Sequence, residues 1–365
     1  MRTKQISPFE ISGIDSLGQG VSKIGEKVTF IPKTAPGDLG EAEILATRKG
    51  VAFGRVKNLK QKSELRIDPI CKHFTQCHSC HFLHVSYETE LKFKKENFLR
   101  LFRKIQMPEI EVIGAPERMG YRNRIQLHYS LKSKLIGMRD SQTFQIVPIP
   151  QCLIGMEEIK KELERLYQNN NWLKEAPSAP TEGHVEIYFK DGLLKKTWNE
   201  SYAAGGFTQV YQEMNGTLKK RLRETWDVQG EELLDLFAGD GNLSNELNYS
   251  KRLCVDFYSQ LPGSEFLNQD LYASDATKHV LKKLHKDNLN PKHLLLDPPR
   301  SGVKNISDWT GLLEPKSVTY VSCDPHTLAR DLQSLEGYQV ERAFLIDFFP
   351  STFHFESMVI LKRIC

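Results

Sequence analysis

The pattern of hydrophobic and polar positions changes twice along this chain. In residues 1–56, short stretches such as KVTFIP and EAEILA alternate apolar with polar side chains, and glycine-containing turns such as GQG, IGE and PGD separate them. A two-residue period is typical of half-buried strands. About five short strands in such a segment predict a small barrel of the oligonucleotide-binding kind.

The rest of the chain divides into a segment that mixes helical and strand patterns and a segment in which strands alternate with helices. Residues 57–204 hold a charged helical pattern, ETELKFKKENFLRLFRKI, followed by strand-like runs such as YRNRIQLHYSL and HVEIYFKDGLLKKTW, which predict a β-rich middle domain. From residue 205 to 365, strand candidates alternate with helices, which predicts a parallel sheet covered by helices. We therefore expect an α/β fold with domains at 1–56, 57–204 and 205–365.

Composition and charge narrow the class of protein. The chain has 365 residues, of which 39% are hydrophobic, enough for ordinary buried cores. No apolar run approaches the roughly 18 residues of a membrane span, and MRTKQISPFEISGID lacks the apolar segment of a secretion signal. We therefore expect a cytoplasmic enzyme, where the seven cysteines stay reduced. The net charge of +4 permits a nucleic-acid partner, and no obligate protein partner is indicated.

A glycine-rich turn after an apolar strand predicts a cofactor site. In LLDLFAGDGN, Gly239 and Gly241 allow close approach of the backbone where the strand leads into a helix. A second strand, LCVDF, ends near Asp256, which is placed to bind a ribose. The spacing between Gly241 and Asp256 is shorter than the roughly 20 residues of a dinucleotide fold, and a P-loop lysine is absent. By itself the turn is as compatible with an ordinary tight turn as with a cofactor.

The next buried strand leads into LLLDPPRSG, residues 294–302. It delivers Asp297, and Pro298 and Pro299 then restrict the backbone. Methyltransferases that act on exocyclic amines place an aromatic residue after the two prolines, to stack on the base. Here that position is Arg300, so we expect a target other than an amine. The alternative interpretation is a strand that simply ends in a turn.

Two further residues could carry covalent chemistry. Cys323 follows the strand in VTYVSCDP, where a nucleophile would meet substrate, although a lone cysteine is more often a small core residue. In FFPSTFHFESMVIL, His354 and Glu356 share one face if the segment is extended. A glutamate in so apolar a stretch is costly unless it is partnered or catalytic.

Together these motifs resemble the RNA uracil-5-methyltransferases. FTQVYQ, LDLFAGDGN, LLLDPPRSGV, YVSCDPHTLARDL and FFPSTFHFESMVIL stand in that family's order within 205–365. The resemblance implies a Rossmann-like class I domain that uses S-adenosylmethionine to make 5-methyluridine in ribosomal or transfer RNA. It implies Cys323 as the nucleophile and Glu356 as the base that takes the carbon-5 proton. It also implies six residues around the cofactor: Gln209, Phe237, Asn242, Asp256, Asp270 and Asp297.

The chemistry explains these residue types. Carbon 5 of uracil is too weak a nucleophile to take a methyl group directly. A thiolate that adds to carbon 6 activates carbon 5, and a carboxylate later removes the carbon-5 proton. The base must also leave its stack to reach such a pocket.

The chain departs from the family pattern in two places. Asp324 replaces the asparagine that usually follows the nucleophile, and could alter a uracil contact or raise the pKa of the thiol. The segment 257–275 replaces the helix expected after the acidic strand, so the adenine side of the pocket could be abbreviated.

The amino-terminal segment has its own resemblance. SLGQGVSKIGEKVTFIPKTAPGD is similar to a TRAM domain, a small RNA-binding barrel attached to several RNA-modifying enzymes. A folding or interaction module without RNA contact is the alternative.

Three cysteines lie close together in CKHFTQCHSC, residues 71–80. Only Cys77 and Cys80 have the C-x2-C spacing of a zinc knuckle. Cys71 precedes them, and Cys152 in VPIPQCLIG is the expected fourth ligand. Several members of the same family carry this C-x5-C-x2-C with a distant cysteine and bind a 4Fe–4S cluster, which such a ligand set suits. Zinc, with His73 or His78 recruited, is the alternative.

The expected partner is RNA. Arg122 and Arg124 in YRNRIQLHY suit phosphate and base contacts, and KFKKENFLRLFRK is either a phosphate-binding helix or a solvated basic face. A barrel with a cluster most resembles the bacterial enzymes of 23S ribosomal RNA, so ribosomal RNA is favoured over transfer RNA. The rival hypotheses are a transfer-RNA enzyme, an enzyme of free nucleotides or DNA, and an RNA-binding iron–sulfur protein that has lost activity.

Overall fold

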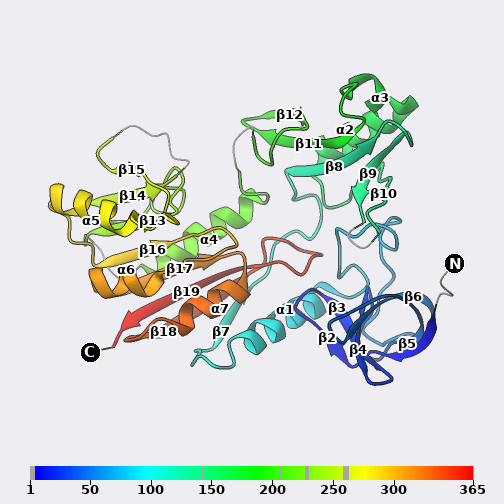
Figure 1. The fold of residues 1–365 in the computed structure, drawn as a ribbon, viewed down its shortest axis with the longest axis horizontal. Helices are drawn as coiled ribbons and strands as arrows, with labels where there is room; N and C mark the ends of the chain where they lie inside the picture. The colour runs from blue at the N-terminus through cyan, green and yellow to red at the C-terminus, as the bar shows by residue number, and fades with distance from the viewer. Residues whose placement is uncertain (1–4, 141–142, 205–207, 227–229, 258–262, 365) are drawn as a thin grey trace. The chain divides into compact units, whose positions relative to one another are not determined.

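The computed structural model describes residues 5–140, 143–204, 208–226, 230–257 and 263–364, which form two compact units (Figure 1). The first unit comprises Met1–Lys94, Ala115–Gln212 and Phe349–Phe353, and the second comprises Lys95–Gly114, Glu213–Phe348 and His354–Cys365. Each unit is thus assembled from separate stretches of sequence. The predicted domain boundary between residues 204 and 205 lies at the edge of the described residues. Phe207 of the FTQVYQ motif lies outside them. No helix within the described ranges is long and apolar enough to cross a bilayer.

The first unit begins with a six-stranded sheet in the order β1-β5-β6-β4-β3-β2. The sheet curls until β1 also lies beside β3, where Glu10 N donates to Ser22 Oγ (3.3 Å) and Ser12 N donates to Val21 O (2.9 Å). Alternating apolar side chains fill its interior, as the two-residue period predicts. The strands are β1 (Ile6–Glu10), β2 (Gly13–Ile14), β3 (Gln19–Ile24), β4 (Lys27–Pro32), β5 (Leu39–Arg48) and β6 (Val51–Gln61).

A second, five-stranded sheet completes the first unit, in the order β10-β9-β8-β11-β12. Helix α2 lies against it because Ile159, Leu163 and Leu166 fall on one helical face and join the sheet's apolar core. The elements are β8 (Arg124–Ser130), β9 (Leu135–Arg139), β10 (Ile146–Val147), α2 (Glu157–Tyr167), the 3-10 helix η1 (Gln168–Asn170), α3 (Trp172–Glu175), β11 (Glu182–Lys190) and β12 (Leu193–Trp198).

The second unit is built on an eight-stranded sheet in the order β15-β14-β13-β16-β17-β19-β18-β7. Its first five strands are parallel, as the alternating sequence pattern predicts, whereas β19 runs antiparallel between β17 and β18. The strands are β7 (Ile110–Ile113), β13 (Leu233–Leu236), β14 (Arg252–Asp256), β15 (Phe266–Asn268), β16 (His293–Leu296), β17 (Ser317–Ser322), β18 (Tyr338–Ile346) and β19 (Glu356–Arg363). The edge strand β7 comes from far earlier in the chain and pairs parallel with β18.

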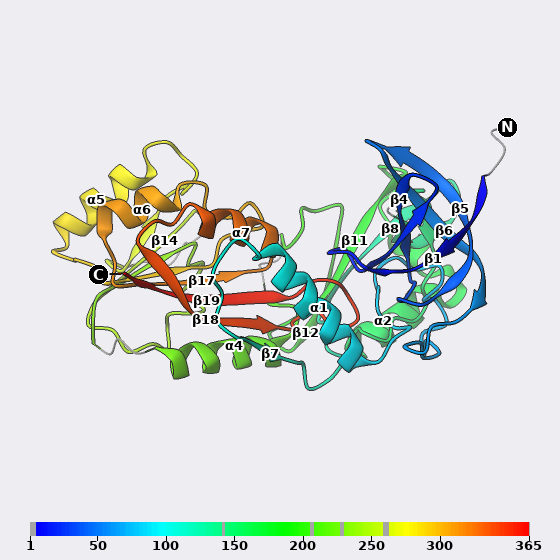
Figure 2. The same ribbon diagram turned by 90° about the horizontal axis from the view of Figure 1, so that it is seen from below.

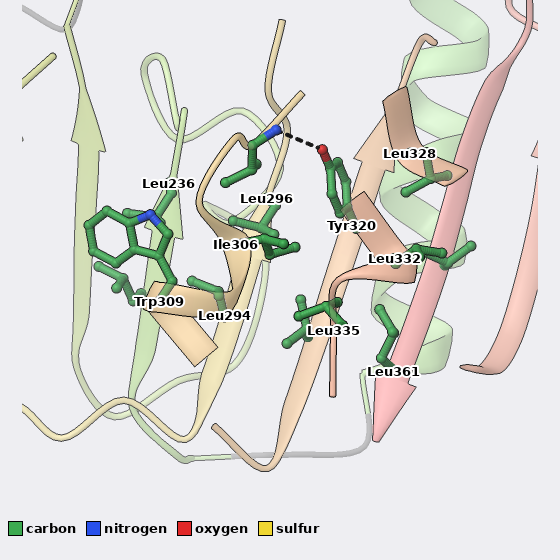
Figure 3. Close-up of a cluster of buried hydrophobic side chains, with 14 of the residues drawn as sticks. Leu236, Leu294, Leu296, Ile306, Trp309, Tyr320, Leu328, Leu332, Leu335 and Leu361 are labelled. Atoms are coloured by element: carbon green, nitrogen blue, oxygen red, sulfur yellow. Dashed lines mark hydrogen bonds between the residues drawn. The ribbon is translucent and has the colours of Figure 1, made fainter. Parts of the chain in front are cut away.

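Helices cover both faces of this sheet (Figure 2). On one face Leu294, Val318 and Val359 join a continuous apolar core with α5, α6, α7 and the end of α1, part of which is drawn in Figure 3. On the other face lies α4, and Trp226 just beyond its end packs edge-on against His293 of β16 (5.4 Å between ring centroids). The helices are α1 (Tyr87–Leu101), α4 (Gln212–Thr225), α5 (Ala276–Lys286), α6 (Ile306–Leu313) and α7 (Pro325–Gln333).

Candidate active site

The carboxyl ends of the parallel strands meet at one edge of the sheet. Leu236 of β13 is in register with Leu296 of β16, and Leu296 is in register with Tyr320 of β17. The residues that follow these strands, Phe237, Asp297 and Cys323, therefore emerge at the same edge, together with Asp256, which ends β14. This is the edge at which open parallel sheets bind ligands.

Strand β19 brings Glu356 to that edge from the opposite direction. Strand β19 is antiparallel to β17, and their ladder ends at the pair Ser322 and Ser357. Cys323, in the bend after β17, and Glu356, the first residue of β19, adjoin that last pair. Glu356 is 6% exposed. Both side chains therefore lie at the end of the same ladder, and the charge of Glu356 acts on the thiol of Cys323.

Burial and neighbouring charges disfavour ionisation of both groups. The pKa of Glu356 lies well above its usual value because the side chain is buried and Asp297 is close, and the positive charge of Arg300 opposes this shift. Burial raises the pKa of Cys323 to about 12, the negative charge of Glu356 adds to the increase, and Arg300 again opposes it. A single guanidinium therefore favours the charged forms of both side chains.

Asp324 has a local structural role. Its Oδ1 accepts hydrogen bonds from His326 N (2.9 Å) and Thr327 N (3.3 Å), so it caps the amino terminus of α7, and Pro325 occupies the first turn. Its negative charge is among those that raise the pKa of Cys323. This agrees with the expectation that an acid here raises the thiol pKa, whereas its effect on a uracil contact stays a prediction.

The turn after β13 has the backbone geometry of a ligand cradle. Phe237, Gly239 and Gly241 all have positive φ angles, of 61°, 53° and 73°. Gly239 N donates to Asp256 Oδ2 (3.0 Å), and the side chain of Asn242 exchanges hydrogen bonds with that of Asn215 on α4 (3.1 and 3.2 Å). The predicted residues Phe237, Asn242 and Asp256 are thus joined to one structured turn.

Asp270 is also near this edge, because β15 precedes it and is parallel to β14. The side chain is exposed, and its Oδ1 accepts a hydrogen bond from Tyr272 N (2.9 Å). Tyr272 in turn lies 5.6 Å from the ring of Phe237, between centroids. Of the shortened segment 257–275, residues 258–262 lie outside the described residues.

Gln209 belongs to the first unit, unlike the other predicted cofactor residues. Its backbone carbonyl accepts hydrogen bonds from Asn123 Nδ2 (2.8 Å) and Gln212 Nε2 (3.1 Å). Its predicted role in cofactor binding stays a prediction.

Sequence reasoning missed Asp235 as a member of this site. The side chain is 2% exposed, and burial raises its pKa to about 7, with a hydrogen bond from Ser244 Oγ (2.5 Å) and the charge of Arg252 opposing the increase. Burial likewise raises the pKa of Asp297 to about 7. An acid within the apolar strand LLDLF was the available signal, because a buried carboxyl group is costly unless it has a partner, as Asp235 has in Ser244, or a ligand uses it.

The four predicted ligand cysteines meet in the first unit. Cys71, Cys77, Cys80 and Cys152 line one cavity, together with His73 and apolar side chains such as Ile149. Burial raises the pKa of Cys80 well above its usual value, and the charges of the other three cysteines add to this while Arg122 opposes it. The backbone carbonyl groups of Phe74 and Cys77 accept hydrogen bonds from Lys33 Nζ.

The two histidines near the cysteines differ. His78 Nε2 lies 2.9 Å from Asp140 Oδ2, so it already has a partner, whereas His73 Nε2 is buried and has no hydrogen-bond partner within the described part of the chain. Over the same described ranges, no three or more His, Cys, Asp or Glu side chains are arranged to hold a single metal ion.

Arg124 is not available to RNA. The side chain is 1% exposed, pairs with Glu186 (2.8 Å between Nη1 and Oε2) and lies over the ring of Tyr188 (4.6 Å). The prediction that it contacts phosphate or bases is therefore wrong. Arg122 is only partly buried and donates from Nε to Arg124 O (2.8 Å).

The second unit has the fold of a class I methyltransferase, a mostly parallel sheet with an antiparallel strand next to β17 and a glycine-rich turn after β13. A solved structure with this fold, a Pyrococcus abyssi tRNA (uracil-54, C5)-methyltransferase in complex with S-adenosyl-L-homocysteine, matches 97% of this chain and 99% of its own, with a TM-score of 0.66 and 19% identity. The sequence model described as tRNA (Uracil-5-)-methyltransferase matches residues 264–364. Together with the curated relatives that follow, these matches make the chain similar to RNA uracil-5-methyltransferases along nearly its whole length.

Curated relatives match along nearly the whole chain. The 23S rRNA (uracil(1939)-C(5))-methyltransferase RlmD of Shewanella woodyi is 26% identical over 99% of this chain and 97% of its own length. The protein of the same name from Enterobacter sp. is 28% identical, with the same two coverages.

Proposed function

We propose that this protein uses S-adenosylmethionine to methylate carbon 5 of a specific uridine in RNA, and that the RNA is 23S ribosomal RNA. The observation that carries the proposal is that Cys323 and Glu356 both adjoin the last pair of the β17–β19 ladder. Addition to carbon 6 requires a thiol, and removal of the proton from carbon 5 requires a base such as a carboxylate close to it. The names of the relatives that match along the whole chain support ribosomal RNA as the substrate.

In this mechanism Cys323 adds as a thiolate to carbon 6 of the uracil and moves electron density onto carbon 5. S-adenosylmethionine supplies an electrophilic methyl group for carbon 5. Glu356 then accepts the carbon-5 proton, the carbon 5–carbon 6 double bond re-forms, and the thiolate of Cys323 leaves. The methyl group replaces one proton, so atoms and charge balance.

The residues around the turn after β13 fit a cationic nucleoside cofactor. The positive-φ turn at Phe237–Gly241 brings backbone close to the strand ends, and Asp256 is placed for a ribose. Asp235 is buried and Asp297 is half-buried, both have raised pKa values, and a sulfonium charge nearby would favour their ionised forms. We assign Gln209, Asn242 and Asp270 to the same cofactor as expectations of the family resemblance.

We also infer that Cys71, Cys77, Cys80 and Cys152 hold a 4Fe–4S cluster, because all four line one cavity. A tetrahedral zinc site needs its thiolate sulfurs about 3.8 Å apart, given a Zn–S distance of about 2.3 Å. The corners of a cubane cluster separate the sulfurs further. His78 is already paired with Asp140, which favours four cysteine ligands over a zinc site that recruits this histidine. When bound, the cluster would supply four metal–thiolate bonds that cross-link the cysteine loop to the segment around Cys152.

The curled six-stranded sheet completes the proposal as a TRAM-like RNA-binding module. On β6, Lys57 is exposed and its charge suits phosphate, whereas the exposed Arg55 pairs with Glu43 (3.4 Å).

One experiment tests the substrate. 5-Methyluridine is mapped in ribosomal and transfer RNA from a strain of the native organism lacking the gene, with and without the gene restored. We expect one position in 23S ribosomal RNA to lose the modification and regain it. If 5-methyluridine were lost from transfer RNA only, the substrate would be transfer RNA instead of ribosomal RNA. No loss in either RNA would overturn the proposed function.

A further inference from the structure

A buried hydrogen-bond network joins the turn after β16 to helix α7. Its centre is Asp331 on α7, which is 2% exposed. Asp331 Oδ2 accepts hydrogen bonds from Tyr320 OH (2.6 Å) and Val303 N (2.7 Å). Figure 3 shows the hydroxyl group of Tyr320 directed at a backbone nitrogen, which is that of Val303 (3.2 Å).

The other carboxylate oxygen holds Arg330. Asp331 Oδ1 accepts from Arg330 Nε (2.8 Å) and Nη2 (2.6 Å), and Nη2 also donates to Ser301 O (2.9 Å). Tyr272 OH donates to Gly302 O (2.9 Å). Three consecutive backbone groups, those of residues 301, 302 and 303, are therefore held in place.

Gly302 shows how closely the turn approaches this network. Its φ is +71°, and a Cβ atom at this position would lie 2.5 Å from Asp331 Oδ2. The carboxylate therefore contacts the backbone of the turn directly, and the turn has no room to shift toward it.

Arg300 immediately precedes this restrained backbone. Its side chain is exposed. The restrained backbone therefore fixes the point from which this side chain extends, at the edge where β16 and the adjacent β17 end. We propose that Asp331 is a positioning residue for the proposed methylation: by restraining residues 301–303, it holds Arg300 toward Cys323 and Glu356.

The charges around Cys323 explain why this matters. Glu356 from β19, Asp297 from the turn after β16, and Asp324 from α7 all face it and all disfavour the thiolate, whereas Arg300 favours it. If the turn moves, the thiol keeps its negative neighbours and loses the cation. The inference rests on the proposed function for its catalytic meaning, but the state of the thiol can be measured without substrate.

The test is the rate of alkylation of Cys323 by iodoacetamide at pH 8, in the full-length protein without RNA or cofactor. Trypsin releases residues 317–330, SVTYVSCDPHTLAR, which contain no other cysteine, so mass spectrometry reads this site alone. We expect Arg300→Gln to slow alkylation about tenfold, since a neighbouring opposite charge shifts a pKa by about one unit or more. Asp331→Asn should slow it several-fold.

The direction of the change separates positioning from direct electrostatics. Removing the negative charge of Asp331 would by itself favour a thiolate and speed alkylation, whereas displacement of Arg300 slows it. In the Arg300→Gln background, Asp331→Asn should no longer slow alkylation. Faster or unchanged alkylation in a folded Asp331→Asn protein, or equal slowing in both backgrounds, would overturn the proposal.

Matched variants guard against a folding defect. Tyr320→Phe removes one hydrogen bond of the network and should slow alkylation less than Asp331→Asn does. Tyr338→Phe removes a similar phenol bond, to Pro315 O (2.7 Å), away from the turn, and should leave the rate unchanged. Equal slowing by both would assign the effect to loss of packing. Absence of methylation by the unaltered protein would overturn the proposed function while leaving this rate comparison readable.

Discussion

Cys323 and Glu356 both adjoin the last pair of an antiparallel ladder, in which Ser322 of β17 is opposite Ser357 of β19. They come from segments more than thirty residues apart in the chain, and the register of two strands alone joins them. Burial raises the pKa of both side chains, and so disfavours the thiolate and the carboxylate that the proposed reaction uses. Catalysis therefore depends on what favours their ionised forms.

Replacing the nucleophile separates chemistry from cofactor binding. Cys323→Ala should lower methylation by on the order of a thousandfold or more, while binding of S-adenosylmethionine, followed by calorimetry, stays nearly intact. RNA containing 5-fluorouridine should form a stable covalent adduct with the unaltered protein only, because fluorine does not leave as a proton does. Comparable turnover by the alanine variant would remove Cys323 from the mechanism.

Replacing the base should trap the intermediate. Glu356→Gln keeps the size of the side chain but cannot accept the carbon-5 proton, so turnover should fall by on the order of 10²–10⁴. We expect a nuclease-sensitive protein–RNA species with ordinary uridine RNA, carrying label from the methyl group of S-adenosylmethionine. His354→Gln is the matched control and should turn over without accumulating adduct. If instead His354→Gln accumulates the adduct, His354 is the base.

The cofactor's charge should change the reactivity of Cys323. The pKa of the thiol is about 12, so alkylation should rise about tenfold per pH unit between pH 7 and pH 9. S-adenosylmethionine is a cation and S-adenosylhomocysteine is not, although their shapes are nearly the same. At saturating concentrations the cation should speed alkylation of the peptide 317–330 several-fold more than the neutral product does. Equal rates would place the sulfonium charge away from Cys323.

The metal content tests the cysteine cavity. Protein purified without oxygen should be brown and contain about four irons per chain. Cys152→Ser should lose the iron although it is remote in sequence from CKHFTQCHSC, whereas Cys254→Ser, outside the cavity, should keep it. Stoichiometric zinc without iron would contradict the cluster.

Much of this protein could be predicted from the sequence because the signals are local. An apolar run followed by Asp297 and two prolines specifies a buried strand and a rigid exit from it, and the same holds for the strand that ends before Cys323. The alternation of strands and helices then predicts a parallel sheet, whose carboxyl edge collects these ends. The barrel strands follow from an equally local two-residue period.

The tertiary structure decided the relationships between remote segments. Sequence reading expected Arg124 at an RNA surface, but β11 brings Glu186 to it and both are buried. It did not place β7 at the edge of the methyltransferase sheet, nor Asp331 against the turn at Gly302. Local propensity acts among residues a few positions apart, whereas strand order, register and the pairing of buried charges depend on how distant apolar faces are covered together. The sequence pattern of one segment does not show which remote segment will pack or pair with it.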